Sequence, residues 1–314
     1  MTPRALAGLV LVSTLLPSAL LAQAAAGAPP QGAPPSQGAA PEGARQGGPP
    51  APAMLQVQKL KDNLFVISGG GGNTTVFVTR NNGVVVIDTK SAGNGPALLE
   101  AIRSITPEPM VTVINSHSHA DHTGNNPSFP LSVRFISHVN TRANMQKMEQ
   151  FQGANAPFIP TQVFQDRLTL FTGPDRIELY YFGPGGTNGD AWIVIPAHRV
   201  MIGADNVNRG LTLIDAANGG SARGFEQTLT RVASEIRDVD TVITGHGGVL
   251  TWSDFLQFSA LTKEFYAWAR AQKAAGKTVE QAAMEYRVPE RYAGYAAPNP
   301  MFMQRILQVV YSEN

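Results

Sequence analysis

HSHADH, residues 117–122, places four metal-ligating side chains within six positions. They are His117, His119, Asp121 and His122. The stretch directly follows MVTVIN (110–115), a near-continuous apolar run typical of a buried strand, so a rigid scaffold presents these side chains. Two histidines at i and i+2 can face one metal ion, while Asp121 and His122 can turn toward a second. One short loop cannot complete two coordination shells, so further ligands must come from elsewhere in the chain.

Two further candidate ligands stand at the ends of apolar runs. Asp205 ends RVMIGAD (199–205), and His246 follows the apolar part of VDTVITGHG (239–247). Asp205 has two carboxylate oxygens and could bridge two ions, and His246 could complete the second shell. Four of the six histidines in the chain belong to this set, which favours a metal site over scattered surface histidines. Imidazole and carboxylate together suit zinc, iron or manganese better than calcium or magnesium.

The amino-terminal residues have the composition of an export signal and a linker. Residues 1–24 carry Arg4, an apolar stretch (5–22) and an Ala-x-Ala cleavage site, which predicts a signal peptide. Residues 25–53 consist mostly of Pro, Gly, Ala and Gln, which predicts a disordered linker. Residues 54–314 remain as one domain. We therefore expect a periplasmic or secreted protein that has no membrane segment after cleavage.

Composition excludes several kinds of chemistry. The formal charge of +1 falls to 0 once Arg4 is removed, and no basic stripe predicts a nucleic-acid partner. The chain has no cysteine, so it has no disulfides, no thiolate nucleophile and no thiolate metal ligand. No serine nucleophile elbow, P-loop or dinucleotide fingerprint is present, and GGGGN (69–73) is only a weak phosphate signal because no helix follows it. The expected partner is a small-molecule substrate.

The order of apolar runs predicts two strand-rich halves, each followed by helices. The first half has predicted strands at 64–68, 74–79, 83–89 and 110–115 and a helix at 96–105. The second half has strands at 167–171, 177–183, 191–195, 199–205 and 239–247 and a helix at 224–236. Only helices follow, one of them opened by a capping box of Thr278 and Gln281. This order predicts two sheets packed face to face with helices outside.

These motifs resemble those of the metallo-β-lactamase-fold hydrolases. The matching segments, in family order, are HSHADH (117–122), GPGGTNGD (183–190), IGAD (202–205) and TGHG (244–247). The resemblance covers roughly residues 55–250 and implies an α/β fold, an αββα sandwich of two mixed β-sheets flanked by helices, with the metals at one edge.

The resemblance also implies the role of each ligand. His117 and His119 would serve the first metal, and Asp121, His122 and His246 the second. Asp205 would bridge the two metals, and Asp88 would support the ligands from behind, although it could equally cap a turn. Asp121 is also the candidate catalytic residue.

One position departs from the family pattern. The family has a histidine after GPG, the third ligand of the first metal, and this chain has Gly186. His198 lies in a turn roughly 15–20 Å from the strand ends that form the site, so it is a poor replacement. His138, Asn188 and Asp190 are other candidates, although Asp190 is expected to order the Gly-rich turn. We therefore expect one tightly held zinc and one weaker zinc, with iron or manganese as alternatives.

Three functions are compatible with these residues. The first is an exported metal-dependent hydrolase that uses metal-bound hydroxide on an ester, lactone or amide bond, because the aspartate at 205 resembles the glyoxalase, lactonase and phosphodiesterase branches. The second is a class B-like β-lactamase, which export would suit. The third is a non-catalytic metal- or ligand-binding domain with a degenerate site. A persulfide dioxygenase is disfavoured, because that branch uses the histidine that is missing here. The Met and Phe residues of the loop 144–162 either cover an apolar substrate or belong to the core.

Overall fold

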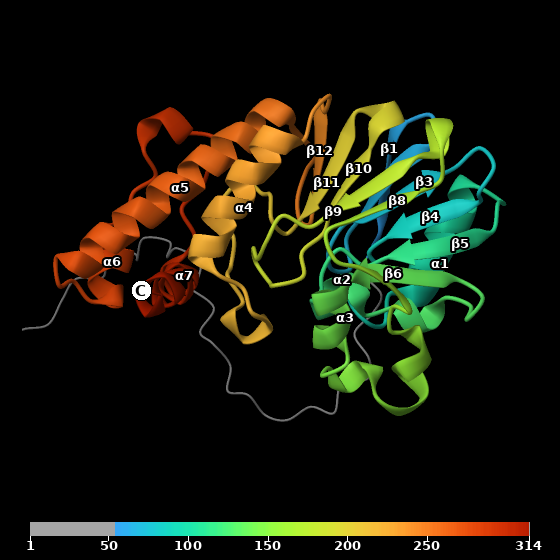
Figure 1. Cartoon of the computed structure of the whole chain (residues 1–314), viewed down its shortest axis with the longest axis horizontal. Coiled ribbons are helices and arrows are strands. Elements are labelled where there is room, and N and C mark those ends of the chain that lie inside the picture. The colour runs from blue at the N-terminus through green and yellow to red at the C-terminus, as the bar shows by residue number, and fades with distance from the viewer. Residues whose placement is uncertain (1–53, 314) are drawn as a thin grey trace, which may run out of the picture. The chain divides into compact units, whose positions relative to one another are not determined.

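A computed structural model describes residues 54–313, which form two β-sheets with helices on their outer faces (Figure 1). The predicted signal peptide (1–24) and linker (25–53) lie outside the described residues. None of the helices within the described part of the chain combines the length and the apolar character that a bilayer span requires.

The first sheet contains seven strands in the order of the sequence. They are β1 (Gln56–Lys61), β2 (Leu64–Ser68), β3 (Thr74–Val78), β4 (Val84–Ile87), β5 (Met110–Ile114), β6 (Arg134–His138) and β7 (Gln162–Phe164). Strands β1 to β4 pair antiparallel, and β4 to β7 pair parallel. The predicted hairpin turn at 80–83 joins β3 to β4, and Gly83 supplies the positive φ of 67° that the turn requires.

The second sheet contains six strands in the order β13-β12-β11-β10-β9-β8. They are β8 (Arg167–Leu170), β9 (Ile177–Tyr180), β10 (Trp192–Ile195), β11 (Val200–Ala204), β12 (Thr241–Thr244) and β13 (Leu250–Thr251). Only β11 and β12 pair parallel, and the other neighbours are antiparallel. Both sheets are therefore mixed.

The described residues also form helices α1 (Gly95–Ile105), α2 (Ala120–Thr123), α3 (Val139–Met145), α4 (Ala222–Glu235), α5 (Trp252–Ala274), α6 (Val279–Glu285) and α7 (Pro300–Ser312). Helices α6 and α7 pack against α5 and against each other. Figure 1 shows α4 and α5 beside the second sheet and α1 beside the first. The predicted capping box of Thr278 and Gln281 opens α6. Asn299 caps α7, where it accepts a hydrogen bond from the Phe302 N–H.

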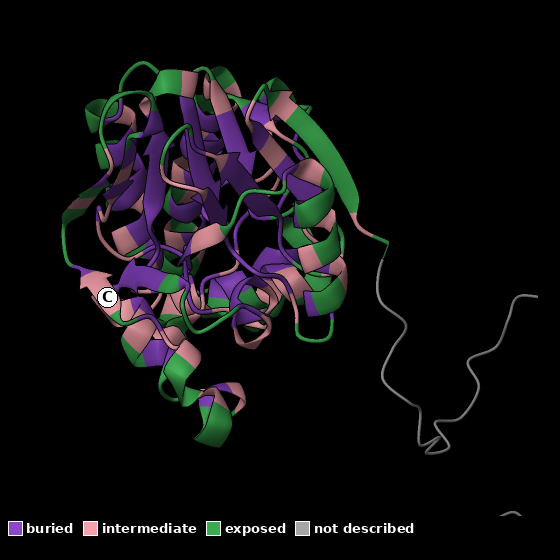
Figure 2. Cartoon of the chain, turned by 90° about the vertical axis from the view of Figure 1, so that its right-hand side faces the viewer, coloured by how far each residue is buried: buried purple, intermediate pink, exposed green. Residues whose placement is uncertain are grey.

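Alternation along the strands builds three apolar layers. In β4, Val85 and Ile87 lie in the core between the sheets, whereas Val84 and Val86 face the side covered by α1. In β10, Ile193 and Ile195 belong to the core between the sheets, and Trp192 and Val194 pack with residues of α4 and α5. Most strands are buried in Figure 2, and β1 is an exposed edge strand. The predicted αββα sandwich is confirmed.

The strand pairing brings the candidate ligands to one edge. The parallel strands β4 and β5 end at Asp88 and at the HSHADH stretch, and the parallel strands β11 and β12 end at Asp205 and just before His246. Carboxyl ends of parallel strands meet at the same edge of a sheet, and this is where open α/β sheets place ligands.

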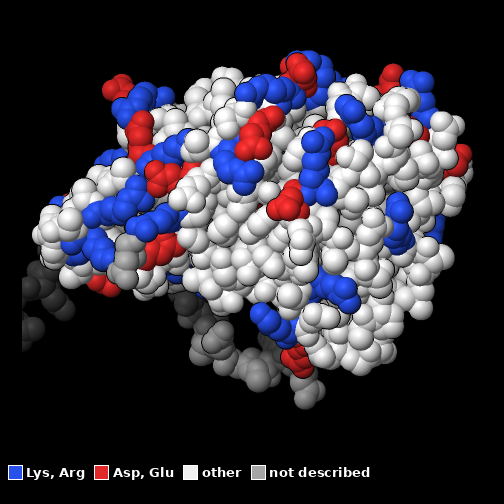
Figure 3. Space-filling model, in the orientation of Figure 1, with Lys and Arg blue, Asp and Glu red and all other residues white. Residues whose placement is uncertain are grey.

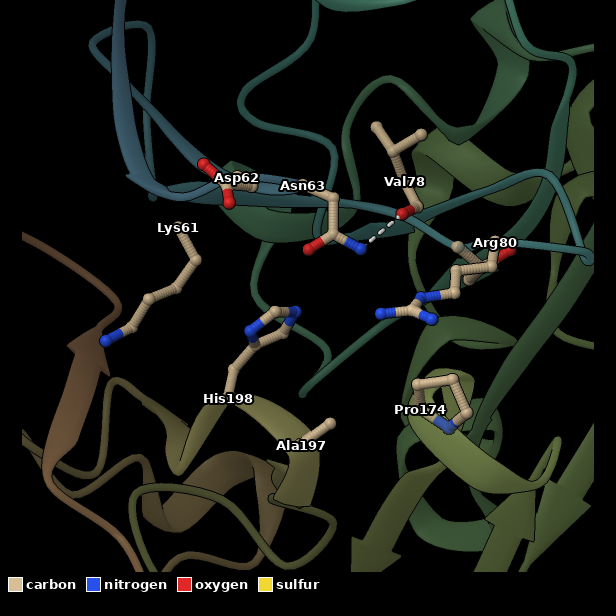
Figure 4. A pocket seen from close by; sticks show the side chains of 9 residues that line it. Lys61, Asp62, Asn63, Val78, Arg80, Pro174, Ala197 and His198 are labelled. Carbon is tan, nitrogen blue, oxygen red and sulfur yellow. Dashed lines mark hydrogen bonds between the residues drawn. The ribbon is translucent and has the colours of Figure 1, made fainter.

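The turn that carries His198 lies at the other end of β10 and β11. His198 stacks edge-on against Phe77 and lines a separate hollow of about 660 Å³ with Lys61, Asn63 and Arg80 (Figure 4). His198 belongs to neither ligand set of the metal cluster.

Candidate metal centre

All six predicted ligands converge at the edge of the sandwich. Four come from the loop after β5 and the first turn of α2, and one each follows β11 and β12. Their side chains form two ligand sets that share Asp205: a first set of His117, His119 and Asp205, and a second set of Asp121, His122, His246 and Asp205.

The first set has its donor atoms close together. His117 Nε2 lies 3.0 Å from His119 Nδ1 and 3.4 Å from Asp205 Oδ2. His119 Nδ1 lies 3.6 Å from the same carboxylate oxygen. These three donors form a triangle, and all three residues line one cavity.

The second set uses the other oxygen of Asp205. His122 Nε2 lies 3.3 Å from His246 Nε2 and 3.1 Å from Asp205 Oδ1. Asp121 Oδ2 lies 3.1 Å from His246 Nε2 and 3.7 Å from His122 Nε2. The two oxygens of Asp205 therefore belong to different sets, as a bridging carboxylate requires.

Both sets fit divalent metal ions. Donors around a tetrahedral zinc at about 2.1 Å lie about 3.4 Å from one another, and the measured spacings bracket this value. Asp205 Oδ1 is buried and accepts no hydrogen bond within the described part of the chain, and its neighbours are the Nε2 atoms of His122 at 3.1 Å and of His246 at 3.4 Å. A buried carboxylate oxygen is costly unless a positive group satisfies it, and a metal ion held between these donors would do so. Nitrogen and carboxylate donors without sulfur suit zinc, iron and manganese.

Asp88 and Ser116 orient the imidazoles from behind. Asp88 Oδ2 lies 2.8 Å from His122 Nδ1 and accepts a hydrogen bond from Ser116 Oγ at 2.6 Å. Ser116 Oγ also lies 2.9 Å from His117 Nδ1. With Nδ1 engaged in this way, Nε2 of each histidine is directed into the centre.

The carboxylates of the site favour positive charge on the neighbouring imidazoles. Burial opposes a charge on His122, but Asp205 and Asp88 together raise its pKa well above the usual value. The hydrogen bond to Asp121 raises the pKa of His246 to about 9. Burial opposes ionisation of Asp205 as well, yet His122 and His117 hold its pKa well below normal. A field that favours imidazolium also favours a divalent cation at the same place.

Asp215 contacts a candidate ligand of the site and was not predicted from the sequence. Its Oδ2 lies 3.1 Å from His119 Nε2 and accepts a hydrogen bond from Asn218 Nδ2 at 2.6 Å. Because His119 offers Nδ1 to the first set, a partner on Nε2 fixes its ring. Asp215 follows no predicted strand and belongs to no motif, so no local signal pointed to it.

Gly186 lines the cavity, where the family has its third histidine ligand. None of His138, Asn188 and Asp190 replaces that ligand in the first set. A Cβ at Gly186 would meet only ordinary contacts, 3.4 Å from Leu213 O and 3.7 Å from Asp190 Oδ2. Asp190 accepts hydrogen bonds from Thr187 N at 2.8 Å and from Thr187 Oγ1, so it orders the Gly-rich turn.

The two remaining candidates are occupied elsewhere. His138 stacks on Tyr181 with ring centroids 3.9 Å apart and caps α3. Asn188 accepts a hydrogen bond from Asn144 Nδ2 at its side-chain oxygen. Neither residue belongs to a ligand set.

The GGGGN segment braces the centre. Gly72 N donates to Asp121 O at 2.9 Å, and a Cβ at Gly72 would collide with the His122 imidazole. Asn73 Nδ2 donates to Thr244 O and Gly247 O, both at 3.0 Å, on either side of His246. This segment therefore ties the HSHADH stretch to the His246 loop, which is a different role from phosphate binding.

A cavity of about 390 Å³ opens above the two ligand sets. Besides the ligands, Gly186 and Asp190, it is lined by Val207, Asn208, Leu211, Thr212, Leu213 and Phe302. The loop 144–162 contributes no lining residue, and its Met145 and Phe151 are buried. Of the two alternatives for the Met and Phe residues of that loop, the structure supports the core assignment for Met145 and Phe151.

An αββα sandwich with paired His/Asp ligand sets at one edge defines a class of metal-binding α/β protein. Residues 68–246 match the model of the metallo-β-lactamase superfamily, and the chain belongs to that family.

The similar proteins described next are distant in sequence. Over 136 residues the chain is 28% identical to the 2,4-dinitroanisole O-demethylase subunit alpha of Nocardioides sp. (strain JS1661), a match that covers 42% of this chain and 40% of that protein. The structure resembles the inverting sec-alkylsulfatase Pisa1 from Pseudomonas sp. with a TM-score of 0.67 and 16% identity, covering 82% of this chain and 50% of that one. It also resembles a metallo-β-lactamase from Pontibacter korlensis with a TM-score of 0.58 and 18% identity, covering 67% of this chain and 99% of that one. At these identities the solved structures show the fold alone.

Proposed function

We propose that this chain is a metal-dependent hydrolase that acts on an ester, lactone or amide bond. The observation that carries the proposal is the pair of ligand sets, joined through Asp205, at the floor of a cavity large enough for a small molecule. Family membership and an organised, open site together favour catalysis over a purely structural metal.

Each residue has a task in this reaction. Bound divalent ions supply Lewis-acid charge and lower the pKa of a coordinated water. Asp205 holds the two sets together, and Asp88, Ser116 and Asp215 fix the imidazole rings. Asp121 is the proposed catalytic residue, because its side chain is 34% exposed and reaches both the second set and the cavity.

Zinc is the proposed metal, with iron or manganese as alternatives. The second set offers three residues of its own and one shared carboxylate, which supports tight binding. The first set offers two imidazoles and the shared carboxylate, so its metal should exchange more readily. Both expectations rest on donor type and number.

Export and a small-molecule partner complete the proposal. The composition of residues 1–24 supports export to the periplasm or the medium. Amino-terminal sequencing of the exported protein should find Ala25, and an intact Met1 would contradict export. Figure 3 shows Lys and Arg interspersed with Asp and Glu on the visible face, which supports a small molecule rather than nucleic acid as partner.

A substrate panel tests the proposed activity. Zinc-, manganese- and iron-loaded protein should hydrolyse at least one of an aryl ester, a γ-lactone and an anilide, and His122→Ala should not. Hydrolysis of a chromogenic cephalosporin alone would favour the β-lactamase alternative. Tight metal binding without turnover of any compound would favour the ligand-binding alternative.

A further inference from the structure

The wall of the cavity differs in character from its floor. The floor carries the charged ligands, and the wall is formed by residues 207–213 together with Phe302 of α7. Val207 and Leu211 are buried, and Leu213 and Phe302 are half-buried. Backbone hydrogen bonding holds this segment over the site, because Asp215 N donates to Gly186 O at 2.8 Å.

The polar side chains of the wall bond to the wall itself. Asn208 Nδ2 donates to Thr212 Oγ1 at 3.0 Å, and Asn208 Oδ1 accepts from Gly210 N at 2.6 Å. Thr212 Oγ1 donates to Asp205 O at 3.2 Å. The apolar surface offered to a substrate away from the metals is therefore mainly that of Leu213 and Phe302, because Leu211 is only 6% exposed and Val207 is fully buried.

No cationic side chain accompanies this wall. Among the described residues that line the cavity, none is lysine or arginine. Arg209 belongs to the same segment, but it is half-exposed and pairs with Asp254 of α5 at 3.1 Å. Positive charge in the loaded site would therefore be confined to the metals on the floor.

We infer that the site selects neutral substrates whose acyl or alkyl part is apolar and disfavours those with a second anionic group remote from the scissile bond. A remote carboxylate would leave water for an apolar wall that offers no counter-charge. An alkyl chain of the same length would gain from burial there. This inference rests on the proposed function for its catalytic form, although the binding preference can be measured without turnover.

A pair of metal-chelating probes tests the preference directly. Pentanohydroxamic acid and glutaric acid monohydroxamate carry the same chelating group and differ at the far end, a methyl against a carboxylate. On zinc-loaded protein, calorimetry should give a Kd about tenfold or more lower for the neutral probe. Equal affinities, or tighter binding of the carboxylate, would overturn the inference on the native protein alone.

Variants locate the preference on the wall. Leu213→Lys places a cation beside the half-buried wall and should remove most of the difference, whereas the matched neutral variant Leu213→Met should keep it. Phe302→Lys, at the first turn of α7, supplies a second cationic variant if Leu213→Lys does not fold. A folded, metal-loaded cationic variant that retains the full difference would contradict the role of the wall.

Ester pairs separate this inference from the proposed function. The holoprotein should hydrolyse 4-nitrophenyl pentanoate with a kcat/KM about tenfold or more above that of mono-4-nitrophenyl glutarate. If neither ester is hydrolysed while the neutral hydroxamate still binds more tightly, the ester-hydrolase activity fails and the substrate class stands. If both esters react equally and both probes bind equally, the hydrolase stands and the substrate class fails.

Discussion

At the scale of single residues, the proposed weakness of the first metal site depends on Gly186. Its backbone lies at the cavity, and its φ is not in the left-handed region, so a side chain there meets neither strain nor a close contact. The neighbouring carboxylate of Asp190 is already engaged, because it accepts hydrogen bonds from Thr187. The vacancy in the first set is therefore a matter of a missing imidazole rather than of a blocked position.

Gly186→His should tighten the first site. A third imidazole completes a shell of nitrogen and oxygen donors, so we expect the weaker zinc to bind at least about tenfold more tightly and the second zinc to be unchanged. Competition with a chromophoric chelator measures both constants. Gly186→Ala is the control for added bulk without a ligand. Unchanged stoichiometry and affinity in Gly186→His would mean that a side chain at 186 does not reach the metals.

At the scale of elements, the brace at residues 69–73 joins two loops that are distant in sequence. Asn73 holds the carbonyls of Thr244 and Gly247, and through them the position of His246. Its own position follows from β2 and β3, which flank the segment. Residues 69–73, between two strands of the first sheet, therefore help to fix the position of His246, a candidate ligand that follows a strand of the second sheet.

Asn73→Ala should loosen the second metal more than it unfolds the chain. Loss of two hydrogen bonds to the His246 loop should weaken that metal by about tenfold or more, as removal of other outer-shell partners does. Asn155→Ala removes a side-chain hydrogen bond of similar length, to Gln150 O at 2.9 Å in the 144–162 loop, and should leave metal affinity unchanged. An equal loss of affinity in both variants would argue for a global effect instead.

His138 caps helix α3 and should make the stability of the protein depend on pH. It accepts a hydrogen bond from Asn140 N as the cap of α3, which requires an unprotonated Nδ1, and burial lowers its pKa to about 4 from a usual value near 6.5. Between these values the unfolded chain binds a proton that the folded chain does not, so stability is full above pH 6.5 and falls as the pH drops toward 4. The contribution is up to about 3 kcal/mol.

Denaturant unfolding at pH 7 and pH 4.5 measures this loss. His138→Asn keeps a capping acceptor without the titration and should show a smaller loss of stability between the two pH values than the native protein. An identical loss in both proteins would assign the effect to other groups.

Strands could be predicted from the sequence where the hydrophobic pattern and the β-propensity of the residues agree. The predicted strand 64–68 coincides with β2, since its residues are β-branched and apolar and both faces are covered. Strand β1, QVQKLK, lacks that signal because it is an exposed edge strand whose place depends on pairing with β2. In the site, the HSHADH stretch could be recognised from the sequence alone, because its candidate ligands are adjacent in the chain. No local pattern marks Asp215 or the wall at 207–213. Tertiary contacts such as the backbone hydrogen bond from Asp215 to Gly186 place these residues at the site.

At the scale of the whole molecule, the candidate ligands come from both sheets. His117 to His122 follow β5 of the first sheet, whereas Asp205 and His246 follow strands of the second. A bound metal would therefore cross-link the two halves of the sandwich, and the unfolded chain would hold it far less tightly. Metal binding should then act on the stability of the entire fold rather than on one loop.

Removal of the metals should lower the melting temperature of the whole domain in a single transition. At free zinc about a thousandfold above Kd, binding adds about 4 kcal/mol, which for a domain of this size corresponds to roughly 8–16 °C. Calorimetry with excess chelator, and again after zinc is restored, measures the shift. His122→Ala should respond little to the chelator, because the second set is lost, whereas His198→Ala should respond as the native protein does, because His198 lies at the other end of β10 and β11. If the chelator leaves the native melting temperature unchanged, metal does not bind the folded state preferentially, and the two sheets are held together by the apolar core alone.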